Sequence, residues 1–156
     1  MDKPEQRDRV VIIGAGFAGI EAARALGKAR IPVTLIDRQN HHLFQPLLYQ
    51  VATAALSPAD IAEPVRKVLR GLESVEVVLG EVTGIDRAAR TVTLANGSHV
   101  PFDYLIVATG AMHGYFGHDE WGTFAPGLKT IEDARKIRSR LLLAFERAEM
   151  SRDPAE

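Results

Sequence analysis

The stretch from Val10 to Asp37, VVIIGAGFAGIEAARALGKARIPVTLID, decides the fold of this chain. Residues 9–13 are almost wholly apolar and β-branched, as in a parallel strand that is buried on both faces. A turn of the form G-x-G-x-x-G follows at residues 14–19. Residues 20–30 are rich in helix-forming side chains, and a second β-branched strand then ends at Asp37. This order of strand, glycine turn, helix and strand predicts a dinucleotide-binding α/β unit.

Each glycine of the turn has a separate physical task. Gly14 permits the tight turn from strand to helix, and Gly16 leaves no Cβ between the backbone and a diphosphate. Gly19 lets the helix pack closely on the strand. The free N–H groups and the positive dipole end of the helix then attract the diphosphate. Asp37 lies where it can accept hydrogen bonds from an adenosine ribose, so its spacing favours a dinucleotide site over a structural turn or a solvated strand end.

Length and composition place narrow limits on the class of protein. The chain has 156 residues, 46% of them hydrophobic, which suits one globular domain with a core. A net charge of -1 gives no indication of nucleic-acid binding. No cysteine is present, which excludes disulfides, Cys-ligated metals and a thiol relay within the chain. The sequence contains no signal peptide and no membrane-spanning run, so we expect the cytoplasm or the cytoplasmic face of a membrane.

Residues 39–57, QNHHLFQPLLYQVATAALS, interrupt the alternation of strands and helices. The segment is too apolar for a solvated loop, so we expect it to pack on another part of the chain. Pro46 excludes one continuous helix, and a short helix is predicted within residues 47–55. A further helix is predicted over residues 58–71, with a kink or division at Pro64.

The second half of the chain predicts mostly strands, followed by one helix. Strands are expected at residues 75–79, 81–86, 91–94, 98–102 and 104–108, with a tight turn at Asn96-Gly97. After an irregular stretch, Thr130 is the expected N-cap of a helix, with an amphipathic surface face, that runs towards Glu149. The antiparallel meander takes the place of a crossover helix. The fold class is therefore α/β, Rossmann-like, with a parallel sheet and a β-meander.

This arrangement resembles the FAD-binding half of the two-dinucleotide-domain flavoprotein reductases, the pyridine nucleotide-disulfide oxidoreductase-like superfamily. Within it, the chain is similar to the type II NADH dehydrogenases, which are single-subunit NADH:quinone oxidoreductases. The stretches that carry the resemblance are NHHLFQPLLYQVATAALSPADIAEPVR at 40–66, YLIVATGA at 104–111, YFGHDEW at 115–121 and APGLKTIEDA at 125–134. The resemblance implies an FAD-binding domain over residues 8–150, with flexible ends at 1–7 and 151–156.

The resemblance also implies where FAD binds. The implied cofactor-binding residues are Gly14, Gly16, Phe17, Ala18, Gly19, Asp37, Arg38, Gln45, Val82, Ala108, Thr109 and Gly110. Asp37 would bind the adenosine ribose, Arg38 would lie beside the adenosine, and the backbone of Val82 would contact the adenine. Residues 108–110 would pass close to the flavin diphosphate and ribityl chain, and residues 44–54 would approach the isoalloxazine. No catalytic side chain is implied, because the flavin carries the chemistry.

In this family, NADH reduces the flavin and a quinone takes the electrons. Three expected features are missing from the sequence: a second G-x-G-x-x-G for NADH, a later Gly-Asp segment that completes the flavin site, and a C-terminal part that docks on the membrane. We therefore expect an N-terminal portion of a longer enzyme, without the NADH domain and incomplete as a catalyst alone. A homodimer is compatible with the resemblance.

Other functions stay open at this point. Disulfide reductases and sulfide:quinone reductases rely on cysteines, which this chain lacks. A ferredoxin or rubredoxin reductase and a non-catalytic dinucleotide-binding fragment are the alternatives. No metal site is expected, because His41, His42, His113 and His118 occur without cysteine and without an H-x-x-x-H pattern. These histidines are expected to be hydrogen-bonded loop residues, with His42 a candidate for a place near the flavin.

Overall fold

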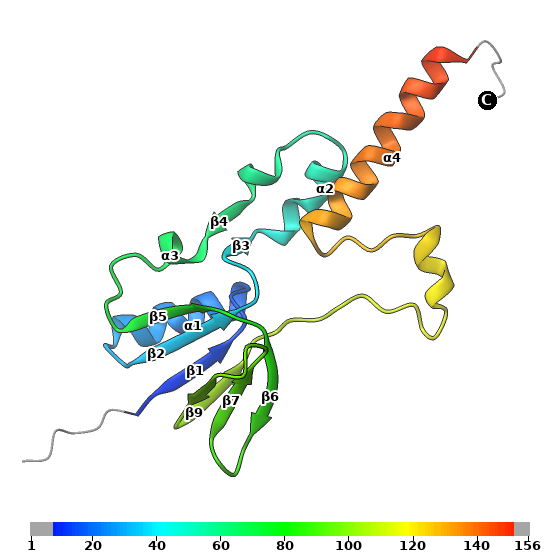
Figure 1. The fold of residues 1–156 in the computed structure, drawn as a ribbon. Helices are drawn as coiled ribbons and strands as arrows, with labels where there is room; N and C mark the ends of the chain where they lie inside the picture. The colour runs from blue at the N-terminus through cyan, green and yellow to red at the C-terminus, as the bar shows by residue number, and fades with distance from the viewer. Residues whose placement is uncertain (1–7, 152–156) are drawn as a thin grey trace, which may run out of the picture. The chain divides into compact units, whose positions relative to one another are not determined.

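The computed structural model describes residues 8–151, which form two compact units (Figure 1). Among the described residues, the sheet unit comprises residues 8–42 and 63–110, and the helical unit comprises residues 43–62 and 111–151. We describe each unit by itself, and the single domain over residues 8–150 stays a prediction. The ends at 1–7 and 152–156 lie outside the described residues, while Ser151 is the C-cap of the last helix.

A parallel sheet of four strands is the centre of the sheet unit. Its order is β5 (Val75–Leu79), β2 (Val33–Asp37), β1 (Val10–Ile13) and β9 (Tyr104–Val107). Every pair in this sheet is parallel, and all four residues of β1 are buried. The apolar composition of β1 follows from this place, because a central parallel strand has neighbours on both faces. The predicted strands are confirmed.

The two faces of the sheet are covered by different elements. Val10 and Ile12 belong to the buried cluster that includes Ile20 and Ala23 of helix α1 (Phe17–Lys28). The alternate residues of β1 belong to a second cluster, together with Val92 and Leu94 of the antiparallel sheet. Side chains alternate across a strand, so one short strand contributes to both cores.

The antiparallel sheet is the predicted meander. It has the order β6 (Val82–Asp86), β7 (Thr91–Leu94) and β8 (His99–Pro101). In the tight turn between β7 and β8, Gly97 has φ +82°, a left-handed conformation that glycine adopts without a steric penalty. The hairpin predicted from Asn96-Gly97 is confirmed.

The helical unit has a core built from two distant parts of the sequence. Helix α2 (Leu48–Ala52), which follows the 3-10 turn η1 (Gln45–Leu47), packs on helix α4 (Ile131–Met150) (Figure 1). The buried residues of this core are Leu48, Val51, Ala52, Ile61 and Ala134. The short helix and the packing of the apolar insertion are therefore confirmed, and part of the insertion is core.

The single helix predicted over residues 58–71 is wrong, whereas the predicted division at Pro64 is confirmed. The structure has only the 3-10 turn η2 (Pro58–Asp60), the short strand β4 (Ala62–Pro64) and helix α3 (Val65–Val68). β4 pairs with β3 (His41–Leu43) in a two-stranded sheet. Pro64 is the cause, because proline lacks an N–H group and biases the residue before it towards extended backbone. The apolar spacing on both sides of Pro64 imitates one helix, and the proline divides it.

Helix α4 begins in a capping box, as predicted. The backbone N–H of Asp133 donates to Oγ1 of Thr130 over 3.1 Å, and Oδ2 of Asp133 accepts the N–H of Thr130 over 3.0 Å. Burial raises the pKa of Asp133. Hydrogen bonds from the Lys129 and Thr130 backbones and the Thr130 hydroxyl, together with electrostatic attraction to His113, nevertheless hold this pKa below its usual value. The irregular stretch before α4 includes one 3-10 turn, η3 (Asp119–Thr123).

Most of α4 lies at the surface, since only Ala134 of its residues is buried. Leu142, Leu143 and Phe145 are exposed in its second half. Within residues 8–151, no helix combines the length and apolar character that crossing a membrane requires.

Candidate dinucleotide-binding site

The strand order of the parallel sheet reverses beside β1. From β1 the chain continues to β2 and β5 on one side, whereas β9 returns to the other side. Because the strands are parallel, their carboxyl ends at Ile13, Asp37 and Val107 share one edge. Open α/β sheets bind ligands outside these carboxyl ends, at the point where the strand order reverses. The glycine turn follows β1 at this point.

The three glycines of the turn differ in what surrounds them. Gly14 has φ +105°, and a Cβ built on it would overlap the carbonyl oxygen of Ala108. A Cβ on Gly19 would overlap the carbonyl oxygen of Gly14. A Cβ on Gly16 would meet no atom within 4 Å. Gly14 and Gly19 are therefore required by the packing of the turn itself, whereas Gly16 faces open space that a bound group can approach.

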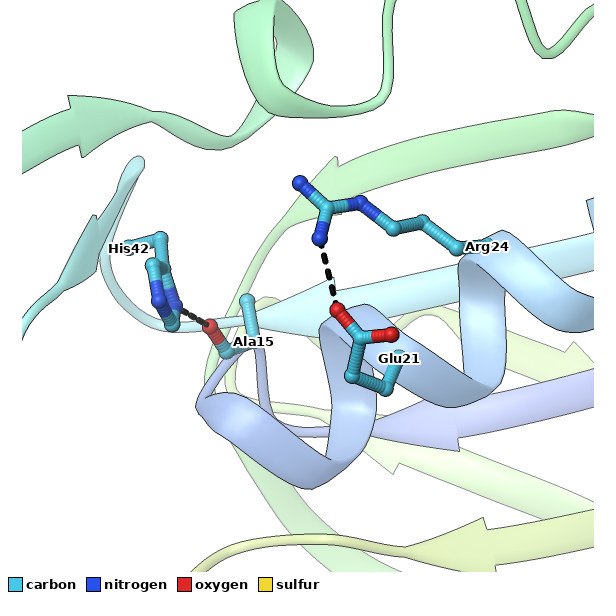
Figure 2. Close-up of polar contacts among 4 residues, drawn as sticks. All are labelled: Ala15, Glu21, Arg24 and His42. Atoms are coloured by element: carbon cyan, nitrogen blue, oxygen red, sulfur yellow. Dashed lines mark hydrogen bonds and ion pairs between the residues drawn. The ribbon is translucent and has the colours of Figure 1, made fainter.

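The N-terminus of α1 carries no cap of its own. Its N-cap is Gly16, which makes no side-chain capping bond, and the first turn contains no acidic residue. The nearest acid along the helix is Glu21, which pairs with Nη1 of Arg24 over 2.6 Å (Figure 2). Gly16, Phe17 and Ala18 are exposed. An uncapped and uncharged helix start attracts anions, because N–H groups of the first turn lack intrahelical acceptors.

Asp37 ends β2 beside the turn and anchors it. Its Oδ2 accepts the N–H of Ala15 over 2.6 Å, and its Oδ1 accepts the N–H of Gln39 over 2.7 Å. A carboxylate has about four lone-pair sites, so both oxygens can accept further hydrogen bonds from hydroxyl groups. The side chain is half-buried. Asp37 is thus fixed in place with acceptor capacity remaining.

The segment after β9 lies against the same turn. The N–H of Ala108 donates to the carbonyl oxygen of Ile13 over 2.8 Å, which brings Ala108 to the start of the glycine turn. Thr109 and Gly110 are exposed beyond it, and Gly110 has φ +71°. The structure therefore brings residues 108–110 together with residues 14–19 and Asp37.

Three further residues of the predicted site lie outside the glycine turn. Arg38 is exposed directly after β2. Val82 begins β6, near the point where the N–H of Gly80 donates to the carbonyl oxygen of Asp37. Gln45 belongs to the helical unit, where its Nε2 donates to the carbonyl oxygen of Lys129 over 3.4 Å. The role of each of them towards a cofactor stays a prediction.

Ala15 is the residue that the sequence analysis missed. It is 3% exposed, and both its backbone groups bond to side chains from the β2–β3 region. Its N–H donates to Asp37, and its carbonyl oxygen lies 2.9 Å from Nδ1 of His42 (Figure 2). The motif cannot indicate this residue, since Ala15 is one of its variable positions and acts through its backbone.

The histidines do not gather around a metal. In the part of the chain that the structure describes, no three residues of the His, Cys, Asp and Glu types form a cluster suited to a metal ion. His41 lies 3.3 Å from Oδ1 of Asn40, and His118 lies 3.2 Å from Oε1 of Glu120. These two are hydrogen-bonded, as expected, but the expected place in a loop is wrong for His41 and His42, which belong to the strand β3 (His41–Leu43).

Known proteins share this fold. The structure is similar to NDH2 from Plasmodium falciparum in complex with NADH, with a TM-score of 0.80 and 26% identity, over 95% of this chain and 31% of that one. It is also similar to the sulfide:quinone oxidoreductase of Aquifex aeolicus, with a TM-score of 0.76 and 26% identity, over 89% of this chain and 32% of that one. The predicted α/β, Rossmann-like fold is confirmed.

The chain is also similar in sequence to two mycobacterial proteins. The chain is 56% identical to the type II NADH:quinone oxidoreductase NdhA of Mycobacterium tuberculosis, over 96% of this chain and 33% of that protein. It is 52% identical to Ndh of the same organism, over 97% of this chain and 34% of that protein. The chain thus spans about a third of the length of these relatives. The family described as pyridine nucleotide-disulphide oxidoreductase matches residues 8–147, and the chain belongs to this family.

Proposed function

We propose that this chain is the FAD-binding portion of a type II NADH:quinone oxidoreductase. The observation that carries the proposal is the exposed, uncapped N-terminus of α1 over Gly16, at the edge of the sheet where Asp37 also lies. That arrangement combines an anion-binding helix start with an acceptor for ribose hydroxyls. The mycobacterial relatives named as NADH:quinone oxidoreductases support the choice of reaction.

The residues of the turn suit an adenosine diphosphate group. The open space over Gly16 admits the diphosphate, and the first-turn N–H groups of α1 can donate to its oxygens. Asp37 can accept the ribose hydroxyls, with Arg38 and Val82 towards the adenosine. Residues 108–110 then border the diphosphate from the β9 side. In this proposal Gln45, which belongs to the insertion, is a further cofactor-binding residue.

FAD, when bound, supplies the redox chemistry between a nicotinamide and a quinone. The chain's own residues contribute binding and orientation. Asp37 fixes one end of the cofactor, and the turn holds the diphosphate. The approach of residues 44–54 to the isoalloxazine stays a prediction. NADH, the quinone, contact with the membrane surface and a homodimer belong to the proposal for the whole enzyme.

The test is a visible absorption spectrum of the purified chain after incubation with FAD and gel filtration. We expect flavin bands in the wild-type protein and in Gly114→Val, a control at an exposed glycine whose Cβ would also meet nothing within 4 Å. Gly16→Val should lose the bands while its circular dichroism stays native. Equal retention by all three proteins, or none by the wild type with excess FAD, would contradict the proposed cofactor site.

Addition of NADH to the flavin-loaded protein separates an enzyme from a binding module. Bleaching of the flavin bands, followed by recovery with a quinone, supports the proposed reaction. Recovery with a ferredoxin or rubredoxin, and none with a quinone, would favour the alternative reductases. Retained flavin that NADH does not bleach would indicate a binding fragment.

A further inference from the structure

His42 is bonded to the glycine turn from 27 residues further along the chain. Its Nδ1 lies 2.9 Å from the carbonyl oxygen of Ala15 (Figure 2). A carbonyl oxygen can only accept, so Nδ1 carries the proton of this hydrogen bond. Ala15 is almost fully buried, so the histidine satisfies an acceptor that water cannot easily reach.

A second contact fixes the orientation of the His42 ring. The ring meets Phe17 edge to face, with 5.1 Å between the ring centroids and 90° between the planes. Phe17 is the first residue of α1. His42 therefore contacts the turn on both sides of Gly16, once through the Ala15 carbonyl and once through the Phe17 ring.

The two bonds at Ala15 set the direction of two consecutive peptide groups. Asp37 holds the N–H of Ala15, and His42 holds its carbonyl oxygen. No peptide bond among the described residues is cis. In a trans peptide the C=O and the following N–H point in opposite directions. With the Ala15 carbonyl turned towards His42, the N–H of Gly16 is turned away from it, on the far side of the peptide.

We propose that His42 is a positioning residue for the diphosphate-binding turn. It acts through the Ala15 carbonyl and aims the N–H of Gly16 before any ligand arrives. This inference rests on the proposed function and deepens it, since it assigns the orientation of the turn to a side chain outside the glycine motif. Such orientation in advance lowers the entropy cost of binding.

The test compares three variants of the purified chain. His42→Leu keeps an apolar side chain against Phe17 but cannot donate to Ala15. His42→Asn places an amide N–H close to the position of Nδ1 and restores the bond. His41→Leu is the matched control one residue earlier, on a side chain whose bond goes to Asn40. Affinities for FAD and for ADP, measured by fluorescence and by competition, are the readouts, with thermal unfolding as a check.

We expect His42→Leu to lower the affinities for FAD and for ADP about tenfold each. The two factors should be similar, because ADP carries the part of FAD that the turn binds. His42→Asn should bind both ligands almost as the wild type does, and His41→Leu should be unchanged. Equal weakening in His42→Leu and His42→Asn would overturn the inference, since packing alone would then explain the effect. Unchanged affinity in His42→Leu would overturn it as well.

A measurement without flavin keeps the inference testable if the proposed function fails. Inorganic pyrophosphate is titrated into the ¹⁵N-labelled chain while the amide resonance of Gly16 is followed. The resonance should shift in the wild type and His42→Asn, and much less in His42→Leu. If the wild-type chain binds no FAD but shows this pattern, FAD is refuted as the cofactor, and the positioning role of His42 is still supported. A Gly16 resonance that pyrophosphate does not shift, or shifts equally in all variants, refutes the positioning role.

Discussion

Helices α1 and α4 begin in opposite ways. The start of α4 is closed by its own side chains, because Thr130 and Asp133 form a reciprocal capping box and Glu132 adds a second acid to the first turn. The start of α1 has a glycine N-cap, no side-chain capping bond and no acid in its first turn. Both helices have the same unsatisfied N–H groups at this end. At α4 the helix's own side chains satisfy two such groups, the N–H of Thr130 and the N–H of Asp133, whereas at α1 no side chain caps the helix.

The difference separates a self-capped helix start from the one that the proposal assigns to anion binding. A capping box stabilises its helix and occupies two of the N–H groups at the helix start. At α1 no side chain caps the helix, and residues outside the helix hold the backbone before it in place instead. Asp37 and His42 act on Ala15, one residue before the N-cap. In the proposal, the missing cap together with the supported turn indicates the anion site, and position in the helix alone does not.

The largest effect should follow from Gly19→Val. A Cβ at this position overlaps the backbone carbonyl of Gly14, which cannot move without displacing β1 from α1. We expect a loss of at least about 3 kcal/mol in the free energy of unfolding, or no folded protein. Urea unfolding followed by circular dichroism measures it. Gly114→Val, at a site with no neighbour within 4 Å, is the control, and a similar loss there would show that the overlap is not the cause.

Gly16→Asp should convert the start of α1 into one like that of α4. The new carboxylate can cap the helix, so stability should change by less than about 1 kcal/mol. Affinity for FAD should fall by more than about a hundredfold, because the acid repels the diphosphate at close range. Gly16→Asn caps without the charge and should lose less affinity. Fluorescence titration of both variants tests this, and an FAD affinity for Gly16→Asp equal to that of the wild type would contradict it.

Thr130→Ala should break the cap of α4 without an effect on the candidate site. Loss of an N-cap threonine costs about 1 kcal/mol of stability. Thermal unfolding measures the loss, and the affinity for FAD should equal that of the wild type. A change in affinity as large as that of Gly16→Asp would show that the two helix starts are not independent in function.

The smallest effect concerns the pH dependence of the same cap. The pKa of Asp133 in the folded protein lies below its usual value of 3.8, so the carboxylate form is favoured by folding. Its contribution to stability is present above that value and is lost as pH falls through the lower pKa of the folded state. Asp133→Asn should therefore flatten the decrease in stability below pH 3.8. Unfolding curves recorded at several pH values in this acid range measure the decrease in stability. An equally steep decrease in the wild type and in Asp133→Asn would refute the role of Asp133.

Local patterns predicted the sheet unit well. In the sheet unit the glycine turn, the acid after β2 and the Asn96-Gly97 hairpin are each marked by a few adjacent residues, and so is the Thr130 cap in the helical unit. Contacts from distant residues also hold the glycine turn, and no local pattern indicates those contacts. The prediction of one helix over residues 58–71 is wrong because the apolar spacing continues through Pro64, where the backbone is extended. The bond from His42 to Ala15 was beyond prediction, since any residue supplies a carbonyl oxygen and only the three-dimensional fold decides which one a histidine meets. Residue roles towards FAD stay predictions.

The core of the helical unit has a consequence for the order in which the protein is made. Arg138 donates to the carbonyl oxygen of Leu56 across 82 residues, and Val51 packs in the same cluster as Ala134. During synthesis β1, α1 and β2 are complete long before α4 leaves the ribosome. The apolar insertion then emerges without its partner and stays exposed while more than half of the chain is translated. Since exposed apolar segments of nascent chains are prone to aggregate, this insertion is the part of the protein with most need of a chaperone.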